Sequence, residues 1–320
     1  MKERVLVTGG AGFIGSHLCE LLCAQGRDVV VLDDLSTGSE RNLEGMPVTL
    51  HRGSVTDPAA VGAAIAGAKK IVHLAALPSV ARSVDRPLDT HHVCATGTAV
   101  MLAAARDAGA RVVYAGSSSA YGNQSALQKH EGLREDPLSP YAAAKLAGEL
   151  YCRAFARVYG MPIVVTRFFN VFGPRQPADS AYSGVIAAFS RALLQGRPVR
   201  LDGDGGQARD FTYVEDVVHG VAQCLDAATT GCETVNLAYG DATTVLDIYT
   251  RLCALARERL GIAEIPPPGR APARAGDVRH SLADITRAKT MFGFQPRIGL
   301  HEGLQRTFDW YRQQVRSPSP

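Results

Sequence analysis

A tyrosine and a lysine stand four positions apart at Tyr141 and Lys145, in an alanine-rich segment whose pattern predicts a helix. Residues with this spacing lie on one helical face, so the phenol and the ammonium should be neighbours. An unperturbed tyrosine has a pKa of about 10, and a nearby positive charge lowers it. The pair could therefore supply a phenolate base near neutral pH, whereas on an exposed helix it would do no chemistry.

Three hydroxyl side chains, Ser117, Ser118 and Ser119, follow the apolar, β-branched run at residues 112–115. If that run is a strand of a parallel sheet, the serines lie at its carboxyl end, where such sheets bind ligands. We therefore expect the serines to face the same crevice as Tyr141. Taken alone, they would indicate only a polar loop.

A glycine-rich turn at Gly9, Gly12 and Gly15 directly follows the apolar run at residues 5–8 and precedes a helical pattern. In this setting the first glycine permits a tight turn, the second lets a pyrophosphate approach the backbone, and the third allows close helix packing. The start of the helix offers free N–H groups and a positive dipole end to phosphates. The segment predicts a dinucleotide-binding turn rather than an ordinary glycine loop.

A carboxylate, Asp33, stands at the end of the second predicted strand. From there it can accept hydrogen bonds from the adenosine ribose hydroxyls, and it would repel a 2′-phosphate. The sequence therefore predicts NAD, rather than NADP, as the cofactor. The positive nicotinamide would then act together with Lys145 to lower the pKa of Tyr141.

The elements that must position these residues alternate along the first half of the chain. Short β-branched runs predict strands and alanine-rich stretches predict helices, which is typical of βαβ units and a parallel sheet. Strands are predicted at residues 5–8, 29–32, 48–51, 71–74, 112–115 and 163–167, and two long helices at 91–108 and 141–159. The fold class is α/β, a Rossmann-type doubly wound parallel sheet with a smaller, loop-rich C-terminal substrate lobe.

Past residue 170, Gly and Pro become frequent between shorter elements. We predict an NAD-binding Rossmann domain at residues 1–170, to which some later segments return. A mainly substrate-binding lobe is predicted at residues 171–315 and a tail at 316–320, with the ligand in the crevice between domain and lobe.

The composition of the 320 residues, 46% hydrophobic and 20% charged, is that of an ordinary globular protein. The net charge of +3 is spread along the chain, so neither a nucleic-acid nor a membrane partner is expected. Seven scattered cysteines form no CxxC pair and no cluster at metal-ligand spacing, which predicts free thiols and no metal site. Without a signal-peptide pattern or a long apolar stretch, a cytoplasmic protein is expected.

Eight motifs, spread over nearly the whole chain, resemble those of a known family. They are TGGAGFIG at residues 8–15, LDDLSTG at 32–38, HLAA at 73–76, SSSAYG at 117–122, SPYAAAKLAGE at 139–149, RFFNVFGPRQ at 167–176, GDGGQARDFTYVEDV at 203–217 and GDVRHSLAD at 276–284. In this order they resemble the extended short-chain dehydrogenases/reductases that act on nucleotide sugars. The resemblance is greatest to the UDP-glucose and UDP-N-acetylglucosamine 4-epimerases.

The resemblance implies a role for each matching residue. Tyr141 would be the base, Lys145 would hold the nicotinamide ribose and tune the tyrosine, and Ser117 would hydrogen-bond the sugar 4-hydroxyl. The implied cofactor-binding residues are Gly9, Gly12, Phe13, Ile14, Gly15, Asp33, Ser36, Thr37, Gly38, Ser54, Val55, Leu74, Ala75, Ala76, Tyr141, Lys145 and Phe168. The implied substrate-binding residues are Ser118, Ser119, Asn170, Arg175, Val185, Leu201, Arg209, Arg274, Asp277 and Ser281.

Among the implied substrate-binding residues, Asn170, Arg209 and Arg274 would hold the diphosphate and Asp277 the uridine ribose. Arginines suit this task because the guanidinium binds phosphate oxygens in pairs. Two positions depart from the family pattern. Ser54 stands where an aspartate usually meets the adenine, and Cys94 stands where the family often has asparagine.

The resemblance implies C4 oxidation of a UDP-hexose to a 4-keto sugar, rotation of the sugar, and return of the hydride to the opposite face. The related 4,6-dehydration needs an Asp-Glu pair at the positions of Ser118 and Ser119, and serine does that acid/base work poorly at neutral pH. UDP-glucuronate 4-epimerisation or decarboxylation stays open, because it begins with the same oxidation and Arg175 could reach a carboxylate. A catalytically silent dinucleotide-binding regulator is the non-enzymatic alternative.

Two further expectations follow from the resemblance. Ser281 aligns with a position that is a bulky tyrosine in epimerases restricted to UDP-glucose, so a serine predicts activity on UDP-GlcNAc/UDP-GalNAc and also on UDP-Glc/UDP-Gal. The helices near residues 91–108 and 141–159 would form a homodimer interface.

Overall fold

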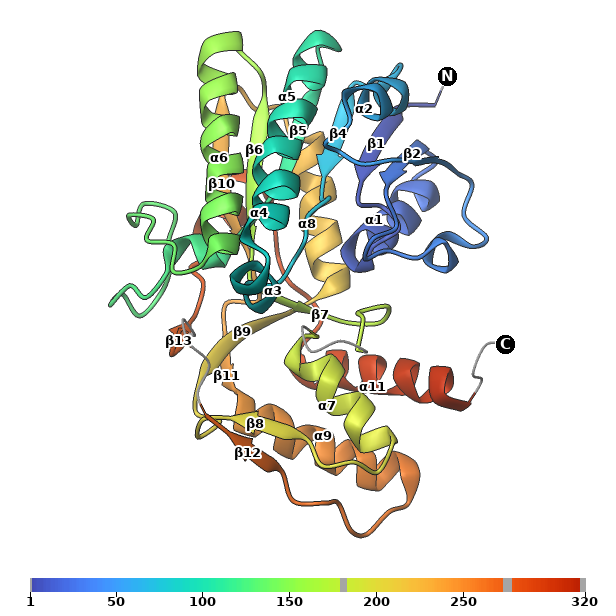
Figure 1. The fold of residues 1–320 in the computed structure, drawn as a ribbon, viewed down its shortest axis with the longest axis vertical. Helices are drawn as coiled ribbons and strands as arrows, with labels where there is room; N and C mark the ends of the chain where they lie inside the picture. The colour runs from blue at the N-terminus through green and yellow to red at the C-terminus, as the bar shows by residue number, and fades with distance from the viewer. Residues whose placement is uncertain (1, 179–182, 273–277, 317–320) are drawn as a thin grey trace.

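The computed structural model describes residues 2–178, 183–272 and 278–316, and it has two parts, a sheet-based domain above and a smaller lobe below (Figure 1). Seven strands form one parallel sheet in the order β10-β6-β5-β4-β1-β2-β3. They are β1 (Arg4–Thr8), β2 (Asp28–Asp33), β3 (Val48–Arg52), β4 (Lys70–His73), β5 (Arg111–Ser117), β6 (Ile163–Phe168) and β10 (Cys232–Leu237). The predicted α/β fold is therefore confirmed, with strand ends shifted by one or two residues.

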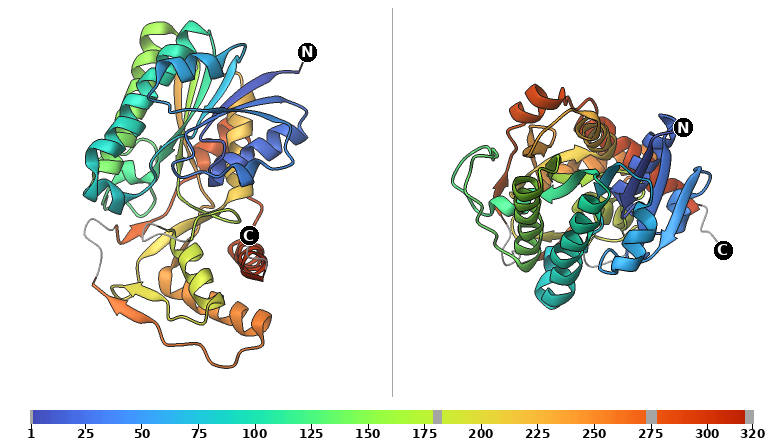
Figure 2. Two further views of the ribbon diagram at one scale, coloured as in Figure 1. Left: turned by 45° about the vertical axis from the view of Figure 1, so that its right-hand side comes forward. Right: turned by 90° about the horizontal axis from the view of Figure 1, so that it is seen from above.

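Helices cover both faces of the sheet, as Figure 2 shows. One face packs on α1 (Phe13–Ala24), α8 (Val214–Asp226) and α10 (Thr286–Phe292). The other packs on α2 (Pro58–Ile65), α5 (Gly97–Asp107) and α6 (Pro140–Tyr159). Successive strand residues alternate between the two cores, so Val5 and Val7 face the first layer and Leu6 the second.

The first long helix differs from its prediction at residues 91–108. The chain is already helical at α4 (Pro87–His91), because Pro87 provides a favourable first turn, and α5 ends at Asp107. Between them His92–Thr96 forms a π-helical turn, a local widening that sequence periodicity does not predict. The shorter helices are η1 (Glu40–Leu43) between β2 and β3, α3 (Val80–Asp85) after β4, and η3 (Ser118–Tyr121) after β5.

The segments after residue 170 divide between the two parts of the molecule. Strand β10 returns to the edge of the large sheet beside β6, together with α8 and α10. The lower lobe has its own core. Its elements are β7 (Asn170–Phe172), α7 (Val185–Leu194), β8 (Arg200–Asp202), β9 (Ala208–Tyr213), β11 (Ala242–Thr244), α9 (Val245–Leu260), β12 (Gly269–Ala271), β13 (His280–Ser281) and α11 (Leu300–Arg316). The division of the chain at residue 170 stays a prediction.

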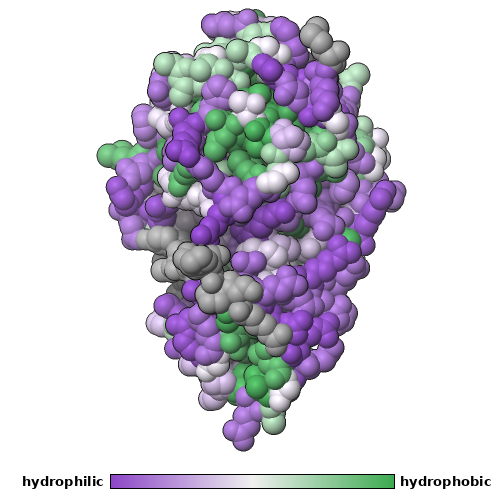
Figure 3. Space-filling view, turned by 90° about the vertical axis from the view of Figure 1, so that its right-hand side faces the viewer, coloured by the Kyte–Doolittle hydropathy of each residue, from purple (hydrophilic) through white to green (hydrophobic). Residues whose placement is uncertain are grey.

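The surface and the cysteines agree with a globular chain. The face in Figure 3 is mainly hydrophilic, with separate apolar patches above and below its middle. Within the described ranges, no helix is long and apolar enough to cross a membrane, and no group of three His, Cys, Asp or Glu side chains could hold a metal ion. All seven cysteines, which lie in described segments, are free thiols, as predicted.

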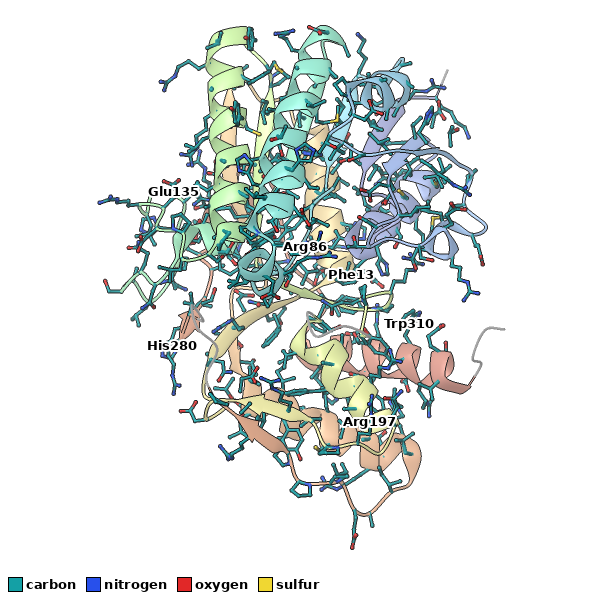
Figure 4. All side chains as sticks on the ribbon, in the orientation of Figure 1. Phe13, Arg86, Glu135, Arg197, His280 and Trp310 are labelled. Atoms are coloured by element: carbon teal, nitrogen blue, oxygen red, sulfur yellow. The ribbon has the colours of Figure 1, made fainter. Side chains whose placement is uncertain are left out.

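A buried ion pair fastens α6 to the sheet. Arg167 on β6 is fully buried, and its Nε and Nη2 atoms lie 3.0 and 2.6 Å from the carboxylate oxygens of Glu149 on α6. Glu135, beside the lower end of α6 in Figure 4, accepts a third bond from Arg167 at 2.7 Å. The Arg167 guanidinium also lies 4.5 Å over the Tyr121 ring. This pair fixes α6 against the strand that ends at Phe168.

We predict that Glu149→Ala lowers the free energy of unfolding by about 3–5 kcal/mol, because it leaves the buried Arg167 charge without its main partner. Glu40→Ala is the matched control, since Glu40 is 42% exposed and its ion-pair partner Arg52 is 70% exposed. That variant should cost less than about 1 kcal/mol. Urea unfolding followed by circular dichroism measures both, and equal losses would contradict the role assigned to the buried pair.

Candidate active site

A cavity of about 800 Å³ opens at the carboxyl ends of the central strands. Its lining comes from the ends of β1, β2, β4, β5 and β6, from the start of α1 and α6, and from the β7 segment of the lower lobe. Phe13, the first residue of α1, lies where the domain meets the lobe (Figure 4). The cavity thus lies at the place where open parallel sheets bind their ligands.

The glycine turn forms one wall of this cavity, because it allows β1 and α1 to approach their neighbours closely. Gly9 has a φ of +72°, and a Cβ there would lie 2.8 Å from the backbone nitrogen of Ala75. A Cβ on Gly15 would lie 2.1 Å from the carbonyl oxygen of Gly9, which is a clash. Gly12 caps the N-terminus of α1, and Phe13, Gly12 and Gly15 line the cavity. Free N–H groups of this first turn are available to a pyrophosphate.

Asp33 anchors the turn and still has hydrogen-bonding capacity. One carboxylate oxygen accepts from the Ala11 N–H and the other from the Leu35 N–H, each at 2.9 Å. Burial raises the pKa of Asp33, and these two backbone bonds oppose the rise. Each oxygen keeps a second lone pair, so the side chain that lines the cavity can also accept from a ribose diol. The glycine cradle and this carboxylate fit the adenosine diphosphate half of NAD.

Most other predicted cofactor residues also line the cavity, namely Ile14, Ser36, Thr37, Val55, Leu74, Ala75, Ala76 and Phe168. Two do not. A Cβ on Gly38 would lie 2.9 Å from the carbonyl carbon of Ala11, so Gly38 packs closely against the backbone of the glycine turn. The hydroxyl of Ser54 pairs with the hydroxyl of Thr56 at 2.9 Å, and only the flanking Gly53 and Val55 reach the lining.

The predicted catalytic residues Ser117, Tyr141 and Lys145 are brought together at the other side of the cavity. Helix α6 begins at Pro140, and the hydroxyl of Ser139 caps it by accepting the Ala142 N–H at 3.1 Å. This start places Tyr141 in the first turn, beside the end of β5. The hydroxyl of Ser117 is close enough to Tyr141 to lower the pKa of that phenol, and it lies 2.7 Å from the Ser119 hydroxyl.

The electrostatics of the pair differ from the sequence prediction. Burial raises the pKa of Tyr141 well above its usual value, and the Ser117 hydroxyl only partly offsets this. Burial also lowers the pKa of Lys145, which is 3% exposed. The expected fall in the tyrosine pKa is therefore not produced by the polypeptide, because desolvation of the phenolate outweighs the neighbouring side chains.

Seven of the ten predicted substrate-binding residues fall into three groups. Ser118, Ser119 and Asn170 line the cavity, and the side chain of Asn170 donates to the carbonyl oxygen of Asp210 at 3.4 Å. Arg209 donates to the carbonyl oxygens of Ala208 and Arg279, and Ser281 lies beside it in register on β13. Arg274 and Asp277 lie outside the described residues.

Three predicted substrate residues have other surroundings. Arg175 points to α1, where its guanidinium lies 2.6 Å from the Glu20 carboxylate. Leu201 is fully buried in the core of the lower lobe, and Val185 packs against the same core. None of the three is among the residues that line the cavity.

Two groups of lining residues were not predicted. Ser79, Val80 and Arg82 come from the start of α3, and Gln176, Pro177, Ser183 and Gly184 come from the connection between β7 and α7. The GPRQ motif at residues 173–176 was a signal for the second group. The first follows directly on the HLAA motif, but its approach to the cavity depends on how α3 packs.

Comparison with known proteins agrees with this geometry. A model of the NAD dependent epimerase/dehydratase family matches residues 5–238. A UDP-glucose 4-epimerase of Mycolicibacterium smegmatis is 37% identical over 97% of this chain and 98% of its own length. A UDP-N-acetyl-alpha-D-glucosaminuronate decarboxylase of Bacillus cytotoxicus is 30% identical over 98% and 99%. A UDP-N-acetylglucosamine 4-epimerase of Methanobrevibacter ruminantium, solved with UDP-N-acetylmuramic acid, superposes with a TM-score of 0.90 at 33% identity, covering 98% of this chain and all of that one. Other similar solved structures hold NAD.

We predict that Asp33→Asn weakens NAD binding by about tenfold or more, because a charge-assisted hydrogen bond to the ribose contributes about 1.5–3 kcal/mol. It should also narrow the preference for NAD over NADP, since the carboxylate no longer repels a 2′-phosphate. Calorimetric titration with both dinucleotides measures this. Asp107→Asn is the control, because Asp107 is 68% exposed and does not line the cavity. Equal effects of both variants would contradict the assignment.

Proposed function

The chain belongs to the NAD-dependent epimerase/dehydratase family, and we propose that it catalyses the 4-epimerisation of a UDP-hexose. NAD is its cofactor. When bound, NAD would supply the nicotinamide group that accepts a hydride from C4 of the sugar and returns the same hydride to C4. The similarity to 4-epimerases over nearly the whole chain supports the proposal.

The residues around Tyr141 suit this reaction. Tyr141 takes the proton of the sugar 4-hydroxyl, and Ser117 holds that hydroxyl in place. Lys145 orients the nicotinamide ribose and contributes positive charge. On the nucleotide side, Asn170 and Arg209 hold the diphosphate, together with Arg274, and Asp277 holds the uridine ribose. Because the nucleotide is held firmly and the sugar only loosely, the 4-keto sugar can rotate and present its opposite face to the returning hydride.

The distribution of carboxylates is the observation that carries the choice of reaction. Among the described residues that line the cavity, the acids are Asp33 and Asp34. They follow β2, three strand spacings from Ser117 at the end of β5, or about 14 Å. A 4,6-dehydration needs an acid and a base beside the sugar, at the positions of Ser118 and Ser119. Epimerisation needs only the base that removes the 4-hydroxyl proton.

Two alternatives to UDP-hexose 4-epimerisation remain, one enzymatic and one non-enzymatic. UDP-glucuronate 4-epimerisation or decarboxylation shares the first oxidation, and similarity to a uronate decarboxylase favours it. The pairing of Arg175 with Glu20 disfavours it, because that guanidinium would have to leave a carboxylate partner to bind a uronate. A catalytically silent dinucleotide-binding regulator is disfavoured because Ser117, Tyr141 and Lys145 line one cavity.

We further propose UDP-GlcNAc/UDP-GalNAc as substrates, with UDP-Glc/UDP-Gal also accepted. Ser281 is only partly buried, and it lies in register beside Arg209. A serine leaves room there for an N-acetyl group, which a tyrosine would fill. Similarity to a UDP-N-acetylglucosamine 4-epimerase supports the choice.

The chain is also proposed to form a homodimer through the helices near residues 91–108 and 141–159. On α6 the apolar side chains of Leu150, Tyr151, Val158 and Tyr159 are 46–69% exposed in the single chain. Burying such a stripe against a second copy would stabilise a dimer. Light scattering decides this, because a mass near the 34.0 kDa of one chain would contradict it.

Incubation of the purified protein with UDP-Glc, UDP-GlcNAc and UDP-GlcA, with products resolved by chromatography, tests the reaction. We expect C4 epimers of the first two sugars. A pentose or a 4-keto-6-deoxy product would contradict the proposal. Tyr141→Phe should lower kcat by about 10²–10⁴, because it removes the acid/base group, and turnover at the unchanged rate would exclude Tyr141 as the base.

Ser281→Tyr should selectively remove turnover of UDP-GlcNAc and keep that of UDP-Glc, because the larger side chain excludes the N-acetyl group. Ser281→Ala is the matched control, and it should keep both activities. The measurement is kcat/KM for each sugar. Full turnover of UDP-GlcNAc by the tyrosine variant would show that this position does not select the substrate.

A further inference from the structure

A chain of buried polar side chains runs beneath the cavity, from the end of β1 to α5. The Oγ1 of Thr8 lies 2.7 Å from Nδ1 of His73, and Nε2 of His73 lies 3.1 Å from Oγ1 of Thr98. All three side chains are at most 1% exposed. We call these three residues the imidazole bridge. None of them is among the residues that line the cavity.

The outer partners of Thr98 and Thr8 determine which atom donates in each hydrogen bond of the bridge. Thr98 uses its single hydroxyl hydrogen on the carbonyl oxygen of Cys94, at 2.6 Å, so its oxygen can only accept from His73. Nε2 of His73 must then carry the ring proton, and Nδ1 must accept from the Thr8 hydroxyl. The oxygen of Thr8 in turn accepts from the backbone N–H of Ala75, at 3.3 Å. Only a neutral His73 in this tautomer satisfies every group.

The two ends of the bridge lie on different sides of the cavity. At one end, Thr8 precedes the glycine turn and binds Ala75, and the segment of Ala75 lines the cavity wall. At the other end, Cys94 lies in the π-helical turn that precedes α5. The bridge therefore connects the dinucleotide wall to the helical layer that contains α6.

Contact with α6 at that second end is unusually close. A Cβ on Gly148 of α6 would lie 2.3 Å from the Tyr114 hydroxyl and 3.2 Å from Oγ1 of Thr98. The absence of a side chain at Gly148 lets Tyr114 donate to the carbonyl oxygen of Lys145 at 3.0 Å. The Nζ of Lys145 lies 4.5 Å above the Tyr114 ring. The catalytic helix thus packs directly on the Thr98 end.

We propose that His73 is a positioning residue, whose two hydrogen bonds hold the dinucleotide wall at Thr8 and the catalytic helix at Thr98 in a fixed relation. The Thr8 bond holds Ala75 and the glycine turn, and so sets the affinity for NAD. The Thr98 bond supports α6, and so sets the rate of the chemical step.

Electrostatics agree with a neutral ring. Burial, with a smaller contribution from the positive charge of Lys145, lowers the pKa of His73 to about 3. The ring keeps one proton throughout the working pH range. A charged imidazolium would donate from both nitrogens and lose the acceptor that Thr8 needs.

Two substitutions of His73 separate the two ends of the bridge. His73→Asn places an amide oxygen near the position of Nδ1 and should keep the Thr8 bond. His73→Gln extends an amide N–H toward Thr98 and should keep that bond. We expect the asparagine variant to bind NAD within about threefold of the parent and to lose about tenfold in kcat. The glutamine variant should weaken NAD binding about tenfold and keep kcat at saturating NAD, each loss being that of one buried hydrogen bond.

Thr8→Val and Thr98→Val provide a second test at the two ends, and they should reproduce the glutamine and asparagine patterns respectively. Thr166→Val is the matched control. Thr166 is equally buried in the same sheet, but its hydroxyl donates to the carbonyl oxygen of Tyr114, at 3.2 Å, outside the bridge. The control should change only the melting temperature.

NAD affinity is measured by calorimetry on protein stripped of nucleotide, at a temperature at which every variant is folded. The kcat measurement rests on the proposed epimerase function. The NAD-affinity measurement needs no sugar, so it tests the role of His73 at the Thr8 end even if that proposed function is wrong. Equal loss of NAD affinity and kcat in both His73 variants would overturn the two-ended role. So would effects no larger than those of Thr166→Val.

Discussion

All seven strands of the central sheet run in the same direction, and the site depends on this constraint. Parallel strands bring their carboxyl ends to one edge, so residues far apart in the chain meet there. The glycine turn after β1, Asp33 at the end of β2, the segment after His73 at the end of β4 and Ser117 at the end of β5 all reach one cavity in this way. The order of the strands then sets their distances, since each neighbour adds about 4.8 Å. Asp33 and Ser117 are therefore separated by the width of two intervening strands, β1 and β4.

Burial gives the groups at that edge their chemical properties. Lys145, Arg167, His73 and Glu149 are all at most 3% exposed, and each has a defined partner. The Arg167 charge is balanced by carboxylates, whereas His73 is held neutral by its surroundings. For Tyr141 the same burial works against the phenolate. The polypeptide therefore places the Tyr141 hydroxyl in the cavity without favouring its ionised form.

The lower lobe is joined to the sheet domain through a buried carboxylate. Asp210 on β9 is fully buried and accepts backbone N–H bonds from Tyr239 and Gly240, both at 2.9 Å, and from Ala283 at 3.3 Å. Tyr239 and Gly240 follow the end of β10, so this side chain connects the edge of the large sheet to the strand that contains Arg209. Burial raises the pKa of Asp210 to about 6, and the backbone bonds oppose the rise. One residue thus fixes the predicted diphosphate-binding arginine relative to the cavity.

The sequence by itself determined the α/β class, the glycine turn and the cofactor, and it predicted Ser117, Tyr141 and Lys145 as the catalytic residues. These depend on local patterns: a β-branched run, a glycine spacing after a strand, and a tyrosine and lysine one helical turn apart. The tertiary structure alone decided what lies next to what. It placed β10 at the sheet edge, paired Arg175 with Glu20 away from the cavity, and buried Leu201 in the lobe core. It also brought α3 and the connection after β7 to the cavity, and it buried Tyr141, which raises the pKa of that phenol. Such features arise from packing between distant segments and from desolvation, and neither leaves a periodic signal in the chain.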